Sequence, residues 1–409
     1  MPDTALVVAA EAWQRRCHLV NLQGCNPAMS DLPSAAQRLR AAISHASRGL
    51  VEREALVELV ALSAVAGEHL LVVGPPGTAK SEAVRRVARA LGGRYFEYLL
   101  GRFTEPSEIF GPVDLRRLKE GVVETEIAGM LPEAEVAFLD EVFLGSTAIL
   151  NTLLALLNER TFRRGHTRIA CPLRICVAAS NAIPDDPSLA AFADRFLGRI
   201  FLEAIPDPQL EELLEGGWRL QAAVTAEGTA SLADLDALAT AAGRADLSAV
   251  RGPLAHAIRL LRKAGVTLSD RRAVKVQRLL AAAGALAGRS SPTDADLWPI
   301  VYAVPTAEGQ ALARNALRDL LSRSESASLP AASAEASSGP RARAVRLVQS
   351  GREALEARPA GGDDQAISAW SLRLEEVARA IDAGFAPEAL PDDLRALREE
   401  IVKAVRARP

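Results

Sequence analysis

The chain has 409 residues, of which 49% are hydrophobic and 24% charged, enough for two or three domains with a sizeable core. Its formal net charge of −3 excludes a general attraction to nucleic acid or to anionic membranes, so nucleic acid is not an expected partner. The four cysteines form no CxxC pair, and no signal peptide or long apolar run is found, so we expect no structural disulfide or zinc site, no membrane span and a cytoplasmic protein.

The first segment, residues 1–30, has no clear hydrophobic period and is predicted to be a poorly ordered arm. Apolar residues at helical spacing then predict two helices between 33 and 66, separated near residues 48–51. Leu50 and Val51 lie in this break. They could form an apolar wall behind a bound base, or they could simply be core residues.

A glycine-rich loop follows the short apolar strand expected at 70–73 and precedes a helix at 81–91. Such a loop directs backbone N–H groups and the positive end of the helix dipole toward one point, where a phosphate can bind. Lys80 would reach the outer phosphates of a nucleotide, and the Ser81 hydroxyl would hold Mg²⁺. Ala79 stands where a second glycine is usual and costs about 1–2 kcal/mol if its φ is positive. The loop consists of Gly74, Pro75, Pro76, Gly77, Thr78, Ala79, Lys80 and Ser81.

A second strand is expected at 95–99, followed by a polar loop and a short helix over 101–111. The alternating stretches 113–118 and 122–127 predict a hairpin around residues 119–121. This insertion could also be a surface loop without a function of its own.

A buried strand over 136–140 ends in two carboxylates, Asp140 and Glu141. Open α/β sheets bind ligands at the carboxyl ends of their strands. Asp140 is therefore expected to hold the Mg²⁺ hydration shell, and Glu141 to deprotonate a water that attacks the γ-phosphate. Acids at a strand end are often only helix N-caps, but the upstream glycine loop favours the catalytic interpretation.

Residues 146–160 have the pattern of a helix with one apolar face, and the basic turn 163–168 leads to a strand at 173–179. The turn could contact a nucleic-acid backbone or a peptide, or it could be a solvated turn. Asn181 follows the strand. Its amide could bind the γ-phosphate or the attacking water, or only form a turn.

A short helix near 190–196 carries Arg195 and precedes Arg199 and a last strand at 200–202. An arginine this far along the chain from the glycine loop could serve the nucleotide of a neighbouring subunit.

Residues 209–320 are helical in pattern, and Ser269 is the predicted N-cap of a helix that runs to Leu286. Arg271 in the first turn opposes the helix dipole. This arrangement predicts a compensating anion such as the γ-phosphate, although a plain surface arginine is the alternative. Residues 322–340 have a linker composition, and 341–409 predict a helical bundle or hairpin.

This order of motifs resembles the AAA+ ATPases, and within them the RavA-like branch of the MoxR family. The resemblance implies a P-loop αβα core with a five-stranded parallel sheet over 31–206, a helix-2 insert near 104–127 and an all-α lid over 207–321. The motifs that carry it are Gly74–Ser81 (Walker A), Phe138–Glu141 (Walker B), Thr104–Gly111, Ile149–Arg160, Asn181 (sensor 1), Asp194–Phe196 and Ser269–Arg271.

The resemblance also implies site roles. ATP and Mg²⁺ would be bound by the glycine loop and Asp140, with the metal on Ser81 and Asp140. Arg195 would be the finger that reaches the next subunit, with Arg199 as the alternative. Arg271 would be the sensor-2 arginine, with Arg272 as the alternative.

Members of this family typically hydrolyse ATP in a ring, usually of six subunits, and remodel or activate a client protein. A partner with a von Willebrand factor A domain is implied in the same way. Two other functions remain open at this point. One is a scaffold that uses nucleotide only to assemble, and the other is a DNA-acting motor, for which the basic turn is the sole feature.

Overall fold

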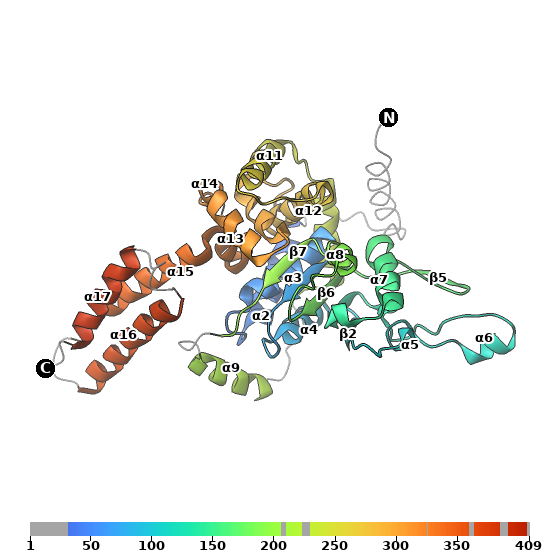
Figure 1. Cartoon of the computed structure of the whole chain (residues 1–409), viewed down its shortest axis with the longest axis horizontal. Helices are drawn as coiled ribbons and strands as arrows, with labels where there is room; N and C mark the ends of the chain where they lie inside the picture. Colours follow the sequence, from blue (N-terminus) through green and yellow to red (C-terminus); the bar gives the residue numbers. More distant parts are fainter. Residues whose placement is uncertain are drawn as a thin grey trace.

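The computed structural model describes residues 32–205, 210–222, 230–324, 326–359, 364–384 and 392–406. The arm expected at 1–30 lies outside these ranges. Figure 1 shows a central body with an extended insert on one side and a helical arm on the other.

The centre of the body is a parallel sheet of five strands, as predicted. The strand order is β2-β3-β6-β1-β7, so the strand before the glycine loop lies between two others. All paired neighbours run parallel, and every residue of β1 and β6 is buried, in agreement with their continuous apolar sequences. The strands are β1 (Leu70–Val73), β2 (Tyr95–Leu99), β3 (Val136–Asp140), β6 (Ile175–Ser180) and β7 (Gly198–Phe201).

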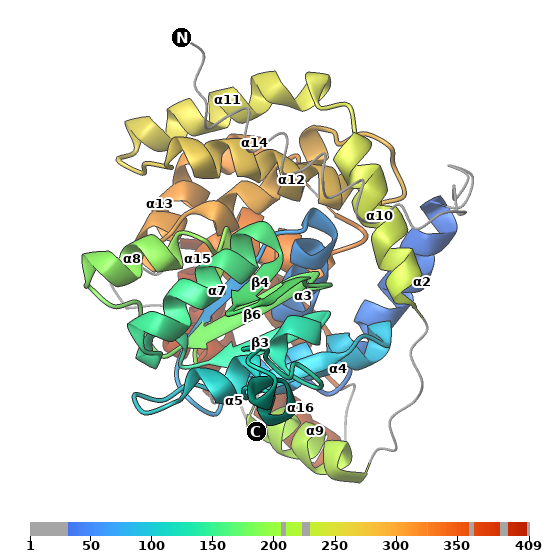
Figure 2. The ribbon, with the colours of Figure 1, turned by 90° about the vertical axis from the view of Figure 1, so that its right-hand side faces the viewer.

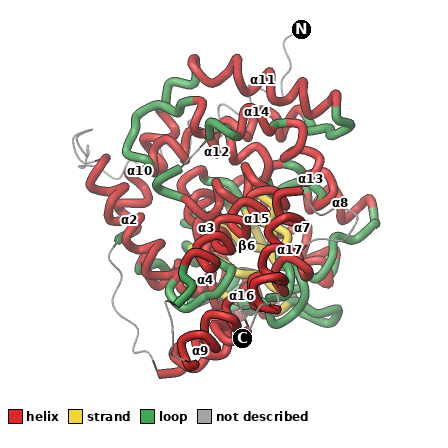
Figure 3. The backbone as a smooth tube through the Cα atoms, turned by 90° about the vertical axis from the view of Figure 1, so that its left-hand side faces the viewer, coloured by secondary structure: helices red, strands yellow, loops and turns green. Residues whose placement is uncertain are grey.

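Helices cover both faces of the sheet (Figure 3). Leu70 and Val72 of β1 join a core with α2, α3 and α4, whereas Leu71 and Val73 join a second core with α7 and α8. The alternation follows from the period of two along a strand. These helices are α2 (Leu32–Ser47), α3 (Glu54–Ala66), α4 (Lys80–Leu91), α7 (Thr147–Glu159) and α8 (Pro187–Ala193).

The insert between β2 and β3 contains α5 (Pro106–Phe110), α6 (Leu115–Lys119) and the 3-10 turn η2 (Leu131–Glu133). The predicted hairpin is wrong in its first half. Asp114 caps α6 by accepting the N–H groups of Arg116 and Arg117, and this local cap outweighs the alternating pattern. Among the described residues of the insert, only one bridge, Val113 to Thr125, remains of the hairpin.

The basic turn does form a hairpin, built from β4 (Thr161–Arg164) and β5 (Thr167–Ala170). Arg163 and Arg168 are exposed, whereas Arg164 donates to the carbonyl oxygen of Gly111 in the insert at 2.9 Å. One of the three arginines therefore joins the hairpin to the insert.

The helical region after β7 lies across one end of the sheet (Figure 2). Its α10, α11 and α12 residues share one continuous hydrophobic core with α2, α3 and the sheet. The 3-10 turn η3 (Val142–Leu144) belongs to the sheet region. α9 (Leu210–Ala222) lies apart from this region, on the other side of the body (Figures 1 and 2). The elements that we call the lid are α10 (Leu232–Arg244), α11 (Ser248–Lys263), α12 (Asp270–Leu286), η5 (Asp294–Asp296), η6 (Trp298–Ala303), α13 (Ala307–Ala316) and α14 (Arg318–Leu321).

The predicted linker at 322–340 is wrong, because residues from Pro330 onward form one helix, α15 (Pro330–Glu356). Leu329, Ala332 and Ala336 pack into the main core. The far end of α15 packs with α16 (Asp364–Gly384) and α17 (Asp392–Arg406) around a separate small core, as the predicted bundle requires. In the described part of the chain, no helix is both long and apolar enough to cross a membrane.

Candidate functional site

The glycine loop leaves the carboxyl end of β1 in a tightly constrained geometry. The N–H of Gly74 donates to the carbonyl oxygen of Ser180 at 3.0 Å, and a Cβ on Gly74 would lie 2.6 Å from the Leu202 carbonyl oxygen. A side chain at this position would therefore push β7 away. Gly77 and Ala79 both have positive φ, +78° and +58°, so the strain expected at Ala79 is present.

Lys80 is 7% exposed and folds back onto the loop. Its Nζ donates to the carbonyl oxygens of Gly74 at 2.7 Å and Pro75 at 2.9 Å. Burial lowers the pKa of Lys80, while the carboxylates of Asp140 and Glu141 act in the opposite direction. The ammonium thus lies at the loop in contacts that phosphate oxygens can replace.

Arg53, just before α3, is a site residue that the sequence did not reveal. It is 5% exposed, and it donates to the carbonyl oxygens of Thr78 at 2.9 Å and Glu203 at 2.8 Å. It therefore ties the glycine loop to the segment after β7. No local motif marks it, since these two partners are backbone atoms 25 and 150 residues away; a third acceptor, the carbonyl oxygen of Glu52, is its neighbour in the chain.

The acidic pair and Asn181 meet beside the loop, because β3, β6 and β1 are neighbours and end at the same edge. The Asn181 amide donates to Glu141 Oε1 at 2.5 Å, and the Glu141 N–H donates to Asp140 Oδ1 at 3.0 Å. Glu141 has a positive φ of 49°, which turns its side chain out of the strand direction. A carboxylate held by an amide at this edge can orient and deprotonate a water.

Ser81 and Asp140 suit Mg²⁺, because that ion prefers hard oxygen ligands and keeps several waters. No cluster of three or more His, Cys, Asp or Glu side chains is present in the ranges that the structure describes. A metal bound by the Ser81 hydroxyl, the Asp140 carboxylate and the phosphates of a nucleotide stays a prediction.

Leu50 and Val51, the expected contacts of the base, are 4% and 7% exposed. Leu50 packs within the main core. Their contact with a base stays a prediction.

Arg195 lies near the amino ends of the sheet strands, whereas the glycine loop lies at their carboxyl ends. It comes three residues before Gly198, which pairs with Leu70 at the amino end of β1. The four residues of β1 span about 13 Å, more than an arginine side chain can bridge. Its Nε is buried, and the structure assigns it no hydrogen bond within the described chain.

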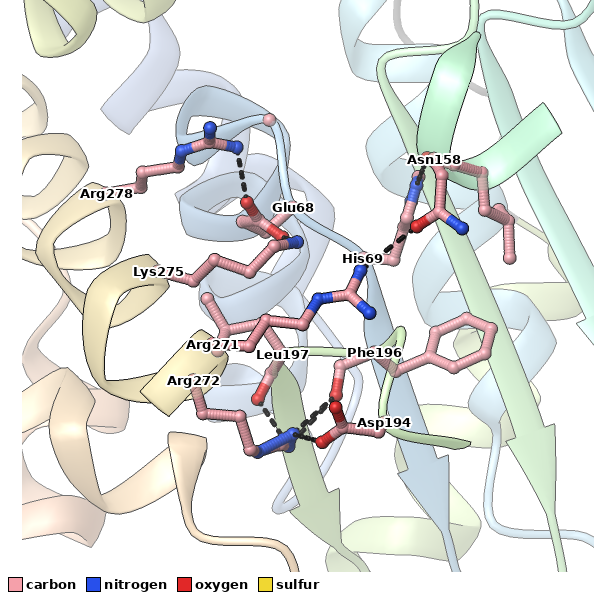
Figure 4. Close-up of polar contacts among 12 residues, drawn as sticks. Glu68, His69, Asn158, Asp194, Phe196, Leu197, Arg271, Arg272, Lys275 and Arg278 are labelled. Atoms are coloured by element: carbon pink, nitrogen blue, oxygen red, sulfur yellow. Dashed lines mark hydrogen bonds and ion pairs between the residues drawn. The ribbon is translucent and has the colours of Figure 1, made fainter. Parts of the chain in front are cut away.

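Arg271 lies at this same end of the strands, on the first turn of α12 (Figure 4). Its Nη2 donates to Asn158 Oδ1 at 3.0 Å, at the end of α7. The sequence predicts an anion beside Arg271. In the isolated chain, this arginine contacts the neutral amide oxygen of Asn158 instead. Arg271 does not face the glycine loop of its own subunit.

The two alternative arginines are both used inside the chain. Arg199 is 5% exposed and donates to the carbonyl oxygens of Pro305 and Ala193 at 2.7 and 2.9 Å, and burial lowers its pKa to about 10. Arg272 is 2% exposed and binds carbonyl oxygens on both sides of the lid boundary. Neither guanidinium is presented to a neighbour.

The fold and site together define a class: a P-loop αβα sheet in the order β2-β3-β6-β1-β7, with its acidic strand end and polar amide beside the loop, is that of the AAA+ ATPases. Within that class, residues 37–240 match the family model of the MoxR domain in the MoxR-vWA-beta-propeller ternary systems. The chain belongs to the MoxR family. Its predicted place in the RavA-like branch stays a prediction.

The chain also matches two known proteins over part of its length. An uncharacterized protein of Methanocaldococcus jannaschii is 33% identical over 249 residues, which cover 60% of this chain and 66% of the relative. Chaperone MoxR1 of Mycobacterium tuberculosis is 28% identical over 184 residues, or 44% of this chain and 48% of that protein. The chain thus spans slightly less than two thirds of the archaeal relative and about half of the mycobacterial one.

A solved structure shows the same fold. It is a protein of Cytophaga hutchinsonii assigned as an ATPase, with a TM-score of 0.59 and 17% sequence identity. The match covers 72% of this chain and 96% of the other.

Proposed function

We propose that the chain is an ATPase that hydrolyses Mg²⁺-ATP in a homo-oligomeric ring, of six subunits by family resemblance, and uses the cycle to remodel or activate a client protein. The observation that carries the proposal is the Glu141–Asn181 pair, 2.5 Å apart beside the phosphate loop. It supplies a held general base where the terminal phosphate of a nucleotide would lie.

The position of Arg195 supports the need for a ring. It lies across the sheet from its own loop, so it can stabilise transferred charge only in a neighbouring subunit. Arg271 lies at the same edge and would serve the same neighbour. Each complete site then combines Lys80, Asp140, Glu141 and Asn181 of one subunit with two arginines of the next.

A von Willebrand factor A-domain protein is the proposed partner. The support is the description of the matching family, whose systems combine MoxR, vWA and β-propeller components. The client stays open.

The decisive test replaces the base. Glu141→Gln should keep ATP bound and lower turnover by about 10²- to 10⁴-fold, as expected for loss of a general base. Glu308→Gln, which removes an exposed carboxylate on α13, is the matched control and should change neither quantity. Undiminished turnover in Glu141→Gln would remove Glu141 from this role, and negligible turnover in the wild-type ring would favour the scaffold function.

The same variant gives access to the client. A ring that binds ATP without turning it over should retain a protein that the wild type releases. Proteins that co-purify with Glu141→Gln in ATP, and not with a Lys80→Ala chain, would identify the client or the partner.

A further inference from the structure

The most extensively bonded buried arginine at the sheet–lid boundary is Arg272, in the first turn of α12. It is 2% exposed. Its Nε donates to the carbonyl oxygen of Ala303 at 3.0 Å, and its Nη2 donates to those of Phe196 and Leu197, both at 3.0 Å. Its Nη1 adds the Phe196 carbonyl oxygen at 3.2 Å and Asp194 Oδ1 at 3.4 Å (Figure 4).

Apart from the contact with Ala303, these contacts are made with the residues on both sides of Arg195 in the chain. Asp194 immediately precedes it, and Phe196 and Leu197 immediately follow it. The buried Nε of Arg195 has no hydrogen-bond partner among the residues that the structure describes. Arg272 holds the chain on both sides of Arg195 against the lid, and Arg199 joins Ala193 to Pro305.

The same side chain also fixes the spacing of two arginines. Arg271 is its neighbour on α12, so the fork of Arg272 joins the helix that carries Arg271 to the loop that carries Arg195. Moving the lid relative to the sheet would move both arginines together.

Stability alone gives a weak reason for an arginine here. Burying a guanidinium costs desolvation, which also lowers the pKa of Arg272, and well-packed apolar residues often replace buried charges without loss. The planar fork, however, binds several carbonyl oxygens in fixed directions, which an ammonium or an apolar side chain does not do.

We propose that Arg272 is a positioning residue for the intersubunit site: it fixes the 194–197 loop to α12, so that Arg195 and Arg271 are presented to the next subunit as one preset pair. The inference rests on the proposed function, since it assigns Arg272 a role only if Arg195 acts on a neighbouring nucleotide.

The first test is Arg272→Lys, which keeps the charge but not the fork. Nucleotide affinity should be unchanged, because the phosphate loop lies at the other edge, while kcat should fall between about ten- and a hundredfold, the cost of a misplaced catalytic group. Adding Glu141→Gln chains before ring assembly should restore turnover. The Arg272→Lys chain still supplies Lys80 and Glu141, and the Glu141→Gln chain supplies a correctly held Arg195.

A parallel mixture separates the two proposals. Arg195→Ala chains mixed with Glu141→Gln chains should also regain activity if Arg195 acts across the subunit boundary. If that mixture stays inactive, the intersubunit site itself is wrong. If it recovers, but Arg272→Lys keeps its full kcat or is not rescued, only the role of Arg272 is overturned.

Two further variants exclude a general loss of folding. Asp194→Asn weakens the contact between Asp194 and Arg272 from a partly exposed side chain, and it serves as the test if Arg272→Lys does not fold. It should lower kcat in the same way, but by a smaller factor. Gln310→Met removes two other buried lid contacts, to the carbonyl oxygens of Arg199 and Val304, without touching the 194–197 loop. It should lower the melting temperature and leave kcat unchanged; an equal loss of kcat there would overturn the proposal.

Discussion

At the scale of single residues, Ala79 has a strained backbone conformation within the glycine loop. Its φ of +58° lies in the left-handed region, where a Cβ costs about 1–2 kcal/mol. Glu141, beside it in space, has the same kind of backbone, with φ at +49°. Both residues belong to the proposed nucleotide site, and strained backbone is commonly found at functional sites.

Ala79→Gly should therefore stabilise the protein. Relief of the strain outweighs the extra chain entropy of glycine, about 0.5–1 kcal/mol, and should raise the melting temperature by about 1–3 °C. Ala83→Gly in the interior of α4 is the matched control and should lower it, because glycine costs about 1 kcal/mol in a helix. A lower melting temperature for Ala79→Gly would mean that Ala79 is not strained.

The sequence was sufficient to predict which polar residues lie together at the carboxyl ends of the strands, while their catalytic roles stay predictions. Lys80, Asp140, Glu141 and Asn181 follow strands whose apolar runs are plain, so their common edge could be predicted. Arg53 could not, because it acts on backbone atoms supplied by the fold. The burial of Arg272 and the orientation of Arg271 depend on how the lid docks, and no local pattern contains that information.

At the scale of elements, α15 connects the main body to the small bundle and begins on a buried acid. Glu58 of α3 accepts the N–H groups of Ala331 at 3.2 Å and Ala332 at 2.7 Å. Burial raises the pKa of Glu58 from 4.5 to about 7, and this effect outweighs the two hydrogen bonds. The start of α15 is therefore fixed by a carboxyl group that titrates near neutrality.

Glu58 should make stability depend on pH. Because its pKa is raised in the folded state, the folded protein binds the proton more tightly, and stability present below pH 4.5 is lost as the pH rises toward 7. At about 1.4 kcal/mol per pKa unit, this loss is at most about 3.5 kcal/mol. Melting temperatures between pH 5 and 7 should fall less steeply in Glu58→Gln than in the wild type.

Glu54→Gln, which changes an exposed carboxylate on the same helix, is the control and should keep most of the slope. Lowered carboxyl pKa values elsewhere, such as that of Asp234 beside Arg38, act in the opposite direction, so the informative quantity is the difference between variant and wild type. Equal slopes in Glu58→Gln and wild type would contradict the assignment.

The sequence failed at α15 for a physical reason. Serine, alanine and proline suggested a linker, yet proline is favoured in the first turn of a helix, where Pro330 lies. The small side chains of Ala332 and Ala336 allow α15 to pack closely against the main core. Amino-acid composition alone therefore did not predict this helix, because its formation depends on packing against the main core.

At the scale of the whole molecule, Glu141 and Asn181 lie at the carboxyl ends of the sheet strands, whereas Arg195 lies near their amino ends. If Arg195 acts on the nucleotide as we propose, a single chain cannot complete the site, and turnover per chain should rise with protein concentration as rings form. Nucleotide affinity should change much less, because the phosphate loop is complete in each chain. Steady-state turnover and light scattering over the same dilution series would measure both quantities.

Arg195→Ala chains are the control and should remain inactive at every concentration while still assembling. Turnover per chain that stays constant down to dilutions at which light scattering shows only monomers would contradict the shared site.

The continuous core between sheet and lid has a consequence for how force is transmitted. The lid elements α12 and η6 pack against α3 and β7 within one hydrophobic core, so hinging the lid away would expose buried side chains of this core to water at about 1.5–3 kcal/mol for each large one. The sheet and lid of each subunit should then move as one rigid body, and the movements of the ring should occur at the interfaces between adjacent subunits.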